Sequence, residues 1–226
     1  MTLGRRVAYG VGEVLITLGL IVAFFAAYEI YGKVPEVNAH QADLTRQLDR
    51  AWTATASILA TVPPSTAVLV QSAPPAPGDP IARLYVPAMH QHWVVVEGVD
   101  LPDIRYAPGH YPGTAMPGQV GNFAVAGHRI PPLFWNLQDV HAGDDIIVET
   151  ATNWYVYQVT HDEIVSPHAI EVVAPTPDRL GVPATVASLT LTTCNPKWAD
   201  YQRLVVHAVL VTTTTHAAGP PVSLGS

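Results

Sequence analysis

The residues of this chain that could do chemistry are one cysteine and two basic side chains, each beside a strand-like segment. Cys194 is the only cysteine among 226 residues, and it ends the strand-like run Thr190–Cys194. Arg203 follows nine positions later, and His128 comes soon after the apolar segment Asn122–Ala126. A lone thiol cannot form an internal disulfide, so in an exported chain it needs another role. A nucleophile is the obvious candidate.

An active nucleophile needs partners, because a cysteine thiol is mostly protonated at neutral pH and the thiolate is the attacking form. His128 follows Gly127 at the mouth of a strand and is a candidate to activate the thiol. Arg203 opens the last strand and could donate fixed N–H groups to an oxyanion. The chain has ten histidines, so one near the thiol is weak evidence alone. The alternatives are a rim histidine, a solvated arginine and a buried, inert thiol.

The N-terminal segment is apolar enough to cross a membrane. Between residues 7 and 30 only two glutamates are charged, and a helix of this length reaches about 36 Å, more than the roughly 30 Å of a bilayer core. Arg5 and Arg6 precede it, so the positive-inside rule predicts a cytoplasmic N-terminus (residues 1–6), a transmembrane helix (7–31) and an extracytoplasmic remainder. A cleaved signal peptide is the alternative, but the run is long and no clear cleavage site precedes residue 28.

Beyond this segment the chain divides into a stalk, a strand-rich domain and a tail. Residues 32–80 are the predicted extracytoplasmic stalk. Any helix within residues 37–60 is expected to be short and marginal because the apolar spacing is loose, and the prolines between 61 and 80 favour extended chain. The folded domain is predicted over residues 81–215, and residues 216–226 are predicted to be a flexible tail.

Seven segments of the folded domain have strand-like composition. They are rich in Val, Ile, Thr, Tyr and Trp and are separated by Gly, Pro and Asp. The segments are Ile81–Val86, Trp93–Glu97, Asn122–Ala126, Ile146–Thr150, Trp154–Val165, Val186–Thr193 and Leu204–Thr213. Helical signal is confined to Leu133–Val140. Seven or eight strands in about 135 residues predict an all-β fold, either an antiparallel barrel or a sandwich.

The charge of the chain argues against nucleic acid as a partner. The formal net charge is -7, whereas nucleic-acid-binding proteins present basic faces. A mild acidic excess is ordinary for a soluble surface, so it identifies no partner by itself.

Two histidines could form a metal pair. His90 and His92 would place their imidazoles on one strand face, but no third ligand is evident, and an exposed strand edge is the favoured interpretation. No clustered carboxylates indicate a calcium site. Neither a metal nor another cofactor is predicted.

Several motifs of the strand-rich domain resemble the sortases, most closely the class E sortases of actinobacteria. The runs Gly127-His128-Arg129 and Thr190-Leu191-Thr192-Thr193-Cys194, with Arg203 beyond, are similar to the His, Thr-Leu-x-Thr-Cys and Arg signature of that family. Further similarity lies in Pro108–Ala115, Pro117–Gln119, Gly121–Phe123, Phe134–Leu137 and Gly143–Asp144. The resemblance extends over roughly residues 81–211. It implies a closed eight-stranded β-barrel with short helices, preceded by the transmembrane helix and the stalk.

The resemblance also implies a cysteine transpeptidase of the cell membrane. Cys194 would attack the Thr–Gly carbonyl of a C-terminal Leu-x-x-Thr-Gly sorting signal. His128 would protonate the departing amine and then deprotonate the incoming one, and Arg203 would hold substrate carbonyls and stabilise the oxyanion. The implied partners are surface proteins that carry a sorting signal and an amine of the peptidoglycan precursor lipid II, with water as a slower acceptor.

Three further residues are candidates for substrate binding. Tyr111 matches the class E tyrosine linked to a preference for Leu-Ala-x-Thr-Gly over Leu-Pro-x-Thr-Gly signals; its alternative is a loop tyrosine that covers the barrel end. Thr192 and Thr193 are expected to line the groove or pack beside the thiol. Three functions stay open: a housekeeping wall-anchoring sortase, a pilus polymerase whose acceptor is a pilin lysine, and a non-catalytic wall-binding domain with Cys194 buried.

Overall fold

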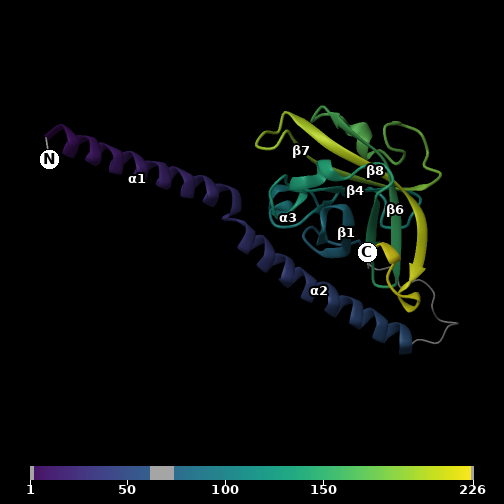
Figure 1. Ribbon diagram of the computed structural model, residues 1–226. Coiled ribbons are helices and arrows are strands. Elements are labelled where there is room, and N and C mark those ends of the chain that lie inside the picture. Colours follow the sequence, from purple (N-terminus) through teal and green to yellow (C-terminus); the bar gives the residue numbers. More distant parts are fainter. Residues whose placement is uncertain (1–2, 62–73, 225–226) are drawn as a thin grey trace.

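A closed barrel of eight strands forms the body of the computed structural model, which describes residues 3–61 and 74–224 (Figure 1). Around the barrel the strands follow the order β1-β2-β3-β4-β7-β8-β6-β5. Their bounds are β1 (Pro80–Val86), β2 (Gln91–Glu97), β3 (Gly109–His110), β4 (Gly121–Ala126), β5 (Asp145–Glu149), β6 (Asn153–Val165), β7 (Ala187–Asn195) and β8 (Gln202–Thr215). The predicted all-β, eight-stranded closed barrel is confirmed, and a sandwich is excluded.

The helices of the barrel domain are short, whereas two long helices precede it. The long ones are α1 (Leu3–Tyr31) and α2 (Val34–Thr61). The short ones are α3 (Leu101–Ile104) and the 3₁₀ segments η2 (Pro87–Met89), η3 (Phe134–Asp139), η4 (Ile170–Val173), η5 (His216–Ala218) and η6 (Val222–Leu224). The helical signal near residues 133–140 corresponds to η3. The sequence pattern missed β3 and α3, which are too short to show a period.

The strand directions differ from the antiparallel expectation. Two pairs are parallel: β2 with β3, and β4 with β7. Between β4 and β7 the chain crosses over through β5 and β6, so it re-enters the sheet beside β4 in the same direction. Because parallel neighbours end at the same edge of a sheet, the residues that follow β4 and those that end β7 come together.

The core fills the inside of the barrel with alternate side chains of the strands. Fully buried examples, each 0% exposed, are Leu84, Phe123, Ile146, Leu189 and Val206. Successive side chains of a strand point to opposite faces. The residues between the core positions on β4, β7 and β8 therefore face the outer wall of the barrel.

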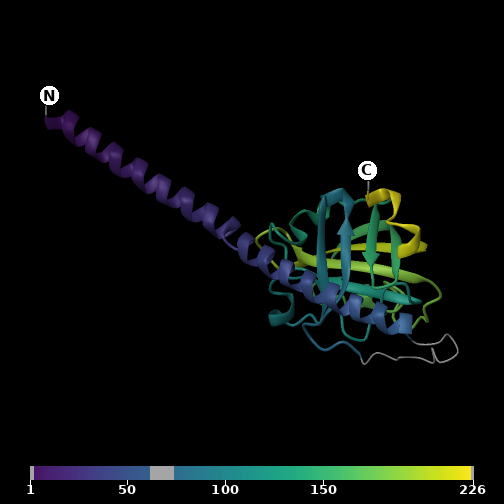
Figure 2. The same ribbon diagram turned by 90° about the horizontal axis from the view of Figure 1, so that it is seen from below.

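α2 corrects the expectation of a short, marginal helix in residues 37–60. It runs for 28 residues and lies along the barrel wall formed by β1 and β2 (Figure 2). Leu44 and Leu48 are 3% and 1% exposed and pack with Val94 and Val96 of β2. Burial of this apolar face supplies the stabilisation that helix propensity alone does not.

Gln41 fixes α2 to β2 through the backbone of Val94. Its side-chain amide donates to the Val94 carbonyl (3.2 Å) and its amide oxygen accepts from the Val94 N–H (2.7 Å). Strand β3 pairs with only two residues of β2, Val96 and Glu97. The edge of β2 at Val94 is thus left to Gln41, whose amide takes the place of a neighbouring strand. The first half of the predicted stalk is therefore a helix held on the barrel.

The predicted flexible tail begins with ordered contacts. The His216 ring lies 5.3 Å from the Trp154 ring and 6.2 Å from the Trp52 ring of α2, and its Nε2 lies 3.6 Å from Glu149. Residues 225–226 of the tail, and residues 62–73 of the proline-rich stretch, lie outside the described residues.

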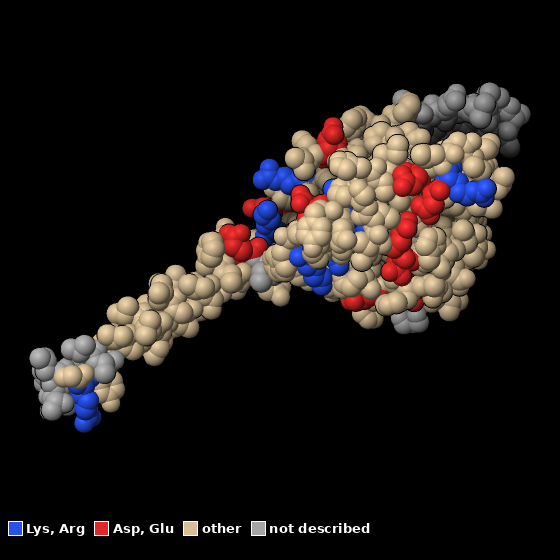
Figure 3. All heavy atoms as spheres, turned by 90° about the horizontal axis from the view of Figure 1, so that it is seen from above, with Lys and Arg blue, Asp and Glu red and all other residues tan. Residues whose placement is uncertain are grey.

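α1 projects away from the barrel as a separate rod in both ribbon views (Figures 1 and 2). Figure 3 shows basic atoms at its free end and an uncharged face along its middle. Its 29 residues correspond to about 43 Å. Among the described residues it supplies the stretch that is long and apolar enough to cross a bilayer.

The docking of α2 predicts that its apolar face stabilises the barrel. Leu48→Ala should lower the free energy of unfolding by about 2–4 kcal/mol, because it leaves a cavity against β2. Urea unfolding of the full-length chain, followed by tryptophan fluorescence, measures this difference. Gln47→Ala, on the exposed face of the same helix, is the matched control. Equal stability of the two variants would mean that α2 does not support the barrel.

Candidate active site

Cys194 lies near the end of β7, between the two strands that fix its position. β7 pairs in parallel with β4 and antiparallel with β8, and in the second pairing Cys194 stands directly opposite Arg203. Leu189 and Leu191 of β7 are fully buried in the barrel. By strand alternation, Cys194 and Arg203 both belong to the outer wall. The thiol is free and partly exposed.

His128 is carried to the same edge by the end of β4. The Gly127 N–H donates to the Thr192 carbonyl (3.0 Å), and the Gly127 carbonyl accepts from the Thr193 hydroxyl (2.8 Å). A Cβ at Gly127 would stand 2.6 Å from the Phe134 ring, so the close approach of this ring requires glycine. The His128 carbonyl accepts from the Phe134 N–H (3.1 Å). These contacts fix the backbone on both sides of the imidazole.

The six residues predicted from the sequence line one cavity of about 440 Å³. They are Tyr111, His128, Thr192, Thr193, Cys194 and Arg203. Leu101 and Ile104 of α3 form an apolar wall of the same cavity. The structure therefore brings all the predicted site residues together, beside a surface that could hold an apolar side chain of a peptide.

The two threonines differ in what they offer to the cavity. The Thr192 hydroxyl lies 3.0 Å from the Tyr111 hydroxyl, and either oxygen can donate. The Thr193 hydroxyl is buried and donates to the Gly127 carbonyl. Thr193 therefore holds the turn before His128 in place, whereas Thr192 and Tyr111 retain hydrogen-bonding capacity for a ligand.

Arg203 is held by the loop between β7 and β8. Its Nη1 donates to the carbonyl oxygens of Asp200 (2.6 Å) and Gln202 (2.9 Å). A guanidinium has five N–H donors in a fixed fork. One nitrogen of Arg203 is thus anchored by backbone, and the remaining donors can face a substrate carbonyl.

Arg129 is a positioning residue that the sequence interpretation missed. Its Nη1 donates to the Cys194 carbonyl (3.1 Å) and to the side chain of Asn195, and its Nη2 donates to Gln138 of η3 (2.7 Å). The guanidinium therefore ties the end of β7 to the segment that follows His128. The sequence feature that could have pointed to Arg129 is its position directly after His128 in the run Gly127-His128-Arg129.

The electrostatics of the cavity disfavour a charged imidazole. Burial lowers the pKa of His128, and the positive charge of Lys33 lowers it further. Lys33 lies in the two-residue turn between α1 and α2. Its influence on His128 means that the cavity lies at the side of the barrel where the apolar helix ends.

His90 and His92, the possible metal pair of the sequence, and His110 lie outside the cavity of Cys194. His90 caps η2 in a left-handed conformation (φ 51°) before β2 begins, and the His92 ring stacks on Tyr85 at 5.5 Å. His110 is buried, with its Nδ1 2.7 Å from a Glu97 oxygen. Neither His90 nor His92 is part of the cavity that holds Cys194.

The comparisons with known proteins agree with the barrel and the cavity. A family model described as the sortase domain matches residues 84–211. Sortase SrtE2 of Streptomyces coelicolor is 30% identical over 93% of this chain and 85% of its own length. Sortase SrtE1 of the same organism is 27% identical over 96% of this chain, which spans only 60% of that relative. The solved structure of sortase E from Streptomyces avermitilis has a TM-score of 0.59 and 35% identity, covering 66% of this chain and 99% of that one.

The fold and the match to the family model define a barrel-type cysteine transpeptidase. The chain belongs to the sortase family, and its relatives include sortases of the E class.

Removal of the Lys33 charge should raise the pKa of His128. Burial and the Lys33 charge both lower the pKa of His128. Lys33→Gln removes the charge, and burial alone still keeps this pKa below its usual range. A larger fraction of His128 is then imidazolium at a given pH. A titration of the full-length chain with ¹³C-labelled histidine, followed by NMR, measures the change.

The difference in the pKa of His128 between the parent chain and Lys33→Gln should become smaller at high ionic strength. Lys33 is exposed, so dissolved salt screens its charge. Lys197→Gln is the matched control, since Lys197 does not contribute to the lowered pKa of His128. An unchanged pKa of His128 in Lys33→Gln at low salt would contradict the proximity of the two charges.

Proposed function

We propose that this chain cleaves the Thr–Gly bond of a C-terminal Leu-Ala-x-Thr-Gly or Leu-Pro-x-Thr-Gly sorting signal and joins the substrate protein to an amine of a peptidoglycan precursor. The observation that carries the proposal is the shared cavity: a thiol, an imidazole and a guanidinium from three strand ends line one space. A peptide carbonyl bound there has a nucleophile, an acid–base group and oxyanion donors within reach.

In the proposed mechanism the Cys194 thiolate attacks the threonine carbonyl and forms a tetrahedral oxyanion. Arg203 stabilises this charge with the N–H groups that the Asp200 and Gln202 carbonyls leave free. Collapse of the oxyanion breaks the C–N bond, and the His128 imidazolium gives its proton to the departing glycine amine. The products of this step are a thioester on Cys194 and a free glycine-bearing segment.

The second half of the reaction is transfer of the acyl group. Neutral His128 takes a proton from the incoming amine as the amine attacks the thioester carbonyl. The thiolate leaves, and an amide bond joins the substrate to the acceptor. Water in place of the amine gives hydrolysis. A cavity with an apolar wall from α3 favours a bound acceptor over bulk water.

The anchor supports an acceptor that is itself bound to the membrane. We propose that residues 1–6 are cytoplasmic, that 7–31 cross the membrane and that the catalytic domain over 81–215 lies outside. Lys33, at the outer end of this helix, is near enough to lower the pKa of His128. A cavity at that side of the barrel is suited to the amine of a precursor such as lipid II, with surface proteins as the other partner.

Tyr111 is proposed to select the signal sequence together with Thr192. Their hydroxyl groups lie 3.0 Å apart at the wall of the cavity. An alanine before the x-Thr-Gly part of the signal keeps a backbone N–H that a proline lacks. A hydroxyl pair can accept a hydrogen bond from that N–H, which would favour the alanine signal.

The full-length chain in detergent should therefore cleave a Leu-Ala-x-Thr-Gly peptide and, with hydroxylamine present, release the Leu-Ala-x-Thr hydroxamate. Cys194→Ala should reduce both reactions by at least about a thousandfold, because no thioester can form. Liquid chromatography with mass spectrometry measures both products. Cleavage by folded Cys194→Ala would contradict the proposed nucleophile.

The same assay tests the two substrate-side groups. Tyr111→Phe should lower the preference for the alanine over the proline peptide, measured as the ratio of kcat/KM values, by roughly threefold to tenfold, the size of one hydrogen bond. Tyr106→Phe, a tyrosine outside the cavity lining, is the control. An unchanged ratio in Tyr111→Phe would remove Tyr111 from selectivity while leaving the reaction itself intact.

A further inference from the structure

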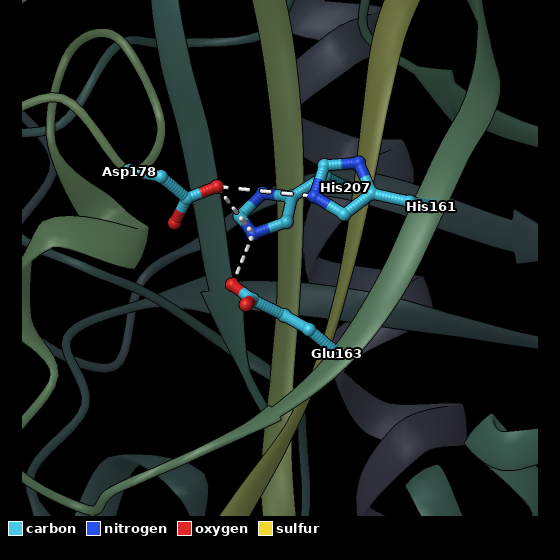
Figure 4. A group of neighbouring side chains, drawn as sticks. All are labelled: His161, Glu163, Asp178 and His207. Carbon is cyan, nitrogen blue, oxygen red and sulfur yellow. Dashed lines mark hydrogen bonds and ion pairs between the residues drawn. The ribbon is translucent and has the colours of Figure 1, made fainter.

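A second group of polar side chains lies on the outer wall of the barrel, away from the cavity of Cys194. It consists of His161 and Glu163 from β6, Asp178 from the loop between β6 and β7, and His207 from β8 (Figure 4). One ligand atom from each residue lies within 4.8 Å of all the others. Three separate segments of the chain therefore direct nitrogen and oxygen atoms toward one point.

The distances within this cluster are those of metal ligands rather than of strong ion pairs. His207 Nε2 lies 3.4 Å from Glu163 Oε1 and 3.6 Å from Asp178 Oδ2, and His161 Nε2 lies 3.8 Å from the same Asp178 oxygen. Charge-assisted hydrogen bonds are shorter, about 2.7–2.9 Å. Ligands about 2.0–2.1 Å from a tetrahedral zinc ion stand about 3.4 Å from one another. The observed spacing is close to this value.

The tautomer of His207 follows from the hydrogen bonds on its other side. The Asn122 amide nitrogen donates to the carbonyls of Val172 (3.2 Å) and Ala174 (3.1 Å), so its oxygen accepts from the Thr190 hydroxyl (2.8 Å). The only hydrogen of that hydroxyl is thereby used. Thr190 must then accept from His207 Nδ1 (3.0 Å). Nδ1 therefore carries a proton, and Nε2 is the nitrogen that faces the carboxylates and is available to a metal ion.

Nε2 of His207 faces two carboxylates, and a positive charge at that point is favourable, either a proton on Nε2 that donates to Glu163 (3.4 Å) or a metal ion bound by the group. The buried His207 ring, 4% exposed, lies on the inner side of the cluster, while His161 and Asp178 are 53% and 37% exposed and leave an entry path. A histidine ligand whose second nitrogen donates to a protein oxygen is the usual arrangement at metal sites. Two imidazoles with two carboxylates suit Zn²⁺, whereas Ca²⁺ and Mg²⁺ prefer oxygen ligands alone.

We propose that His161, Glu163, Asp178 and His207 bind one Zn²⁺ ion that fastens the loop of residues 166–186 to β6 and β8. Among the four, Asp178 alone comes from this loop. Asn122 already holds an earlier part of the loop through Val172 and Ala174. The metal fixes the later part to the same wall of the barrel.

The site is structural rather than catalytic because of its place on β8. His207 lies on the same face of the strand as Arg203, four residues further along, or about 13 Å. The metal is therefore separate from the Cys194 cavity, and its binding can be measured without any turnover.

The test uses the full-length Cys194→Ala chain, purified in detergent without a histidine tag, so that no thiolate competes for zinc. Calorimetric titration with Zn²⁺, in competition with a chelator, should give one ion per chain. Asp178→Asn and His161→Gln, both at exposed positions, should weaken the affinity by at least about tenfold. Thr190→Val, which removes the partner of His207 Nδ1, should weaken it by about 10–100-fold. His92→Ala, outside the cluster, is the matched control and should bind zinc unchanged.

Limited proteolysis tests whether zinc holds the loop of residues 166–186 against the barrel. Arg179 follows Asp178 and is exposed, so trypsin can cleave the loop there. Zn²⁺ should slow this cleavage in the parent chain and in His92→Ala, but not in Asp178→Asn. Absence of zinc binding, equal affinity in Asp178→Asn and His92→Ala, or displacement of zinc by equimolar Ca²⁺ would each overturn the proposal. None of these outcomes depends on the peptide-cleaving reaction.

Discussion

The register of β7 is the constraint on which the rest of the structure depends. β7 lies between β4, which runs parallel to it, and β8, which runs antiparallel. Leu189 and Leu191 fill the barrel from this strand. A slip of one residue would turn them out to solvent, at a cost of about 1.5–3 kcal/mol each, and would turn Cys194 inward. Core packing thereby decides that Cys194 reaches the outer wall opposite Arg203.

The same wall carries both groups of polar residues. Cys194, Arg203 and His128 occupy the edge where β4 and β7 end, whereas Thr190 of β7 and its partner His207 of β8 lie further from that edge. The hydrogen bonds of Thr190 and Asn122 connect this wall to the loop before β7. One sheet face thus positions the candidate nucleophile at one end and holds the loop of residues 166–186 further along. The docked helix α2 holds the apolar α1 at the side where His128 lies.

The sequence predicted the positions of the strands better than it predicted which elements and side chains contact one another. The strand segments and the residues of the Cys194 cavity were predictable, since alternation marks strands and Cys194, His128 and Arg203 belong to a specific family pattern. α2 was underestimated because its stability depends on Leu44, Leu48 and Gln41 meeting β2, which no local pattern reveals. Arg129 was missed because its partners are the backbone of Cys194 and the side chain of Gln138. The parallel pairing of β4 with β7 follows from chain topology, which composition does not contain.

The cluster around His207 was also beyond the reach of the sequence. Its ligands are separated by up to 46 positions and follow no recognised metal-binding spacing, whereas the close pair His90 and His92 drew attention and proved unrelated. Sequence patterns detect ligands on one element or one tight loop. They do not detect ligands that a barrel brings together from two strands and a distant loop.

The central claim is that Cys194 becomes the acyl carrier, and intact-mass analysis of the protein tests it most directly. The full-length chain would be mixed with a Leu-Ala-x-Thr-Gly peptide, quenched in acid within one turnover and digested to locate any adduct. We predict a mass gain equal to the Leu-Ala-x-Thr acyl group, on Cys194 alone, which hydroxylamine removes. An adduct on another residue, or peptide cleavage in the absence of any adduct, would contradict the account.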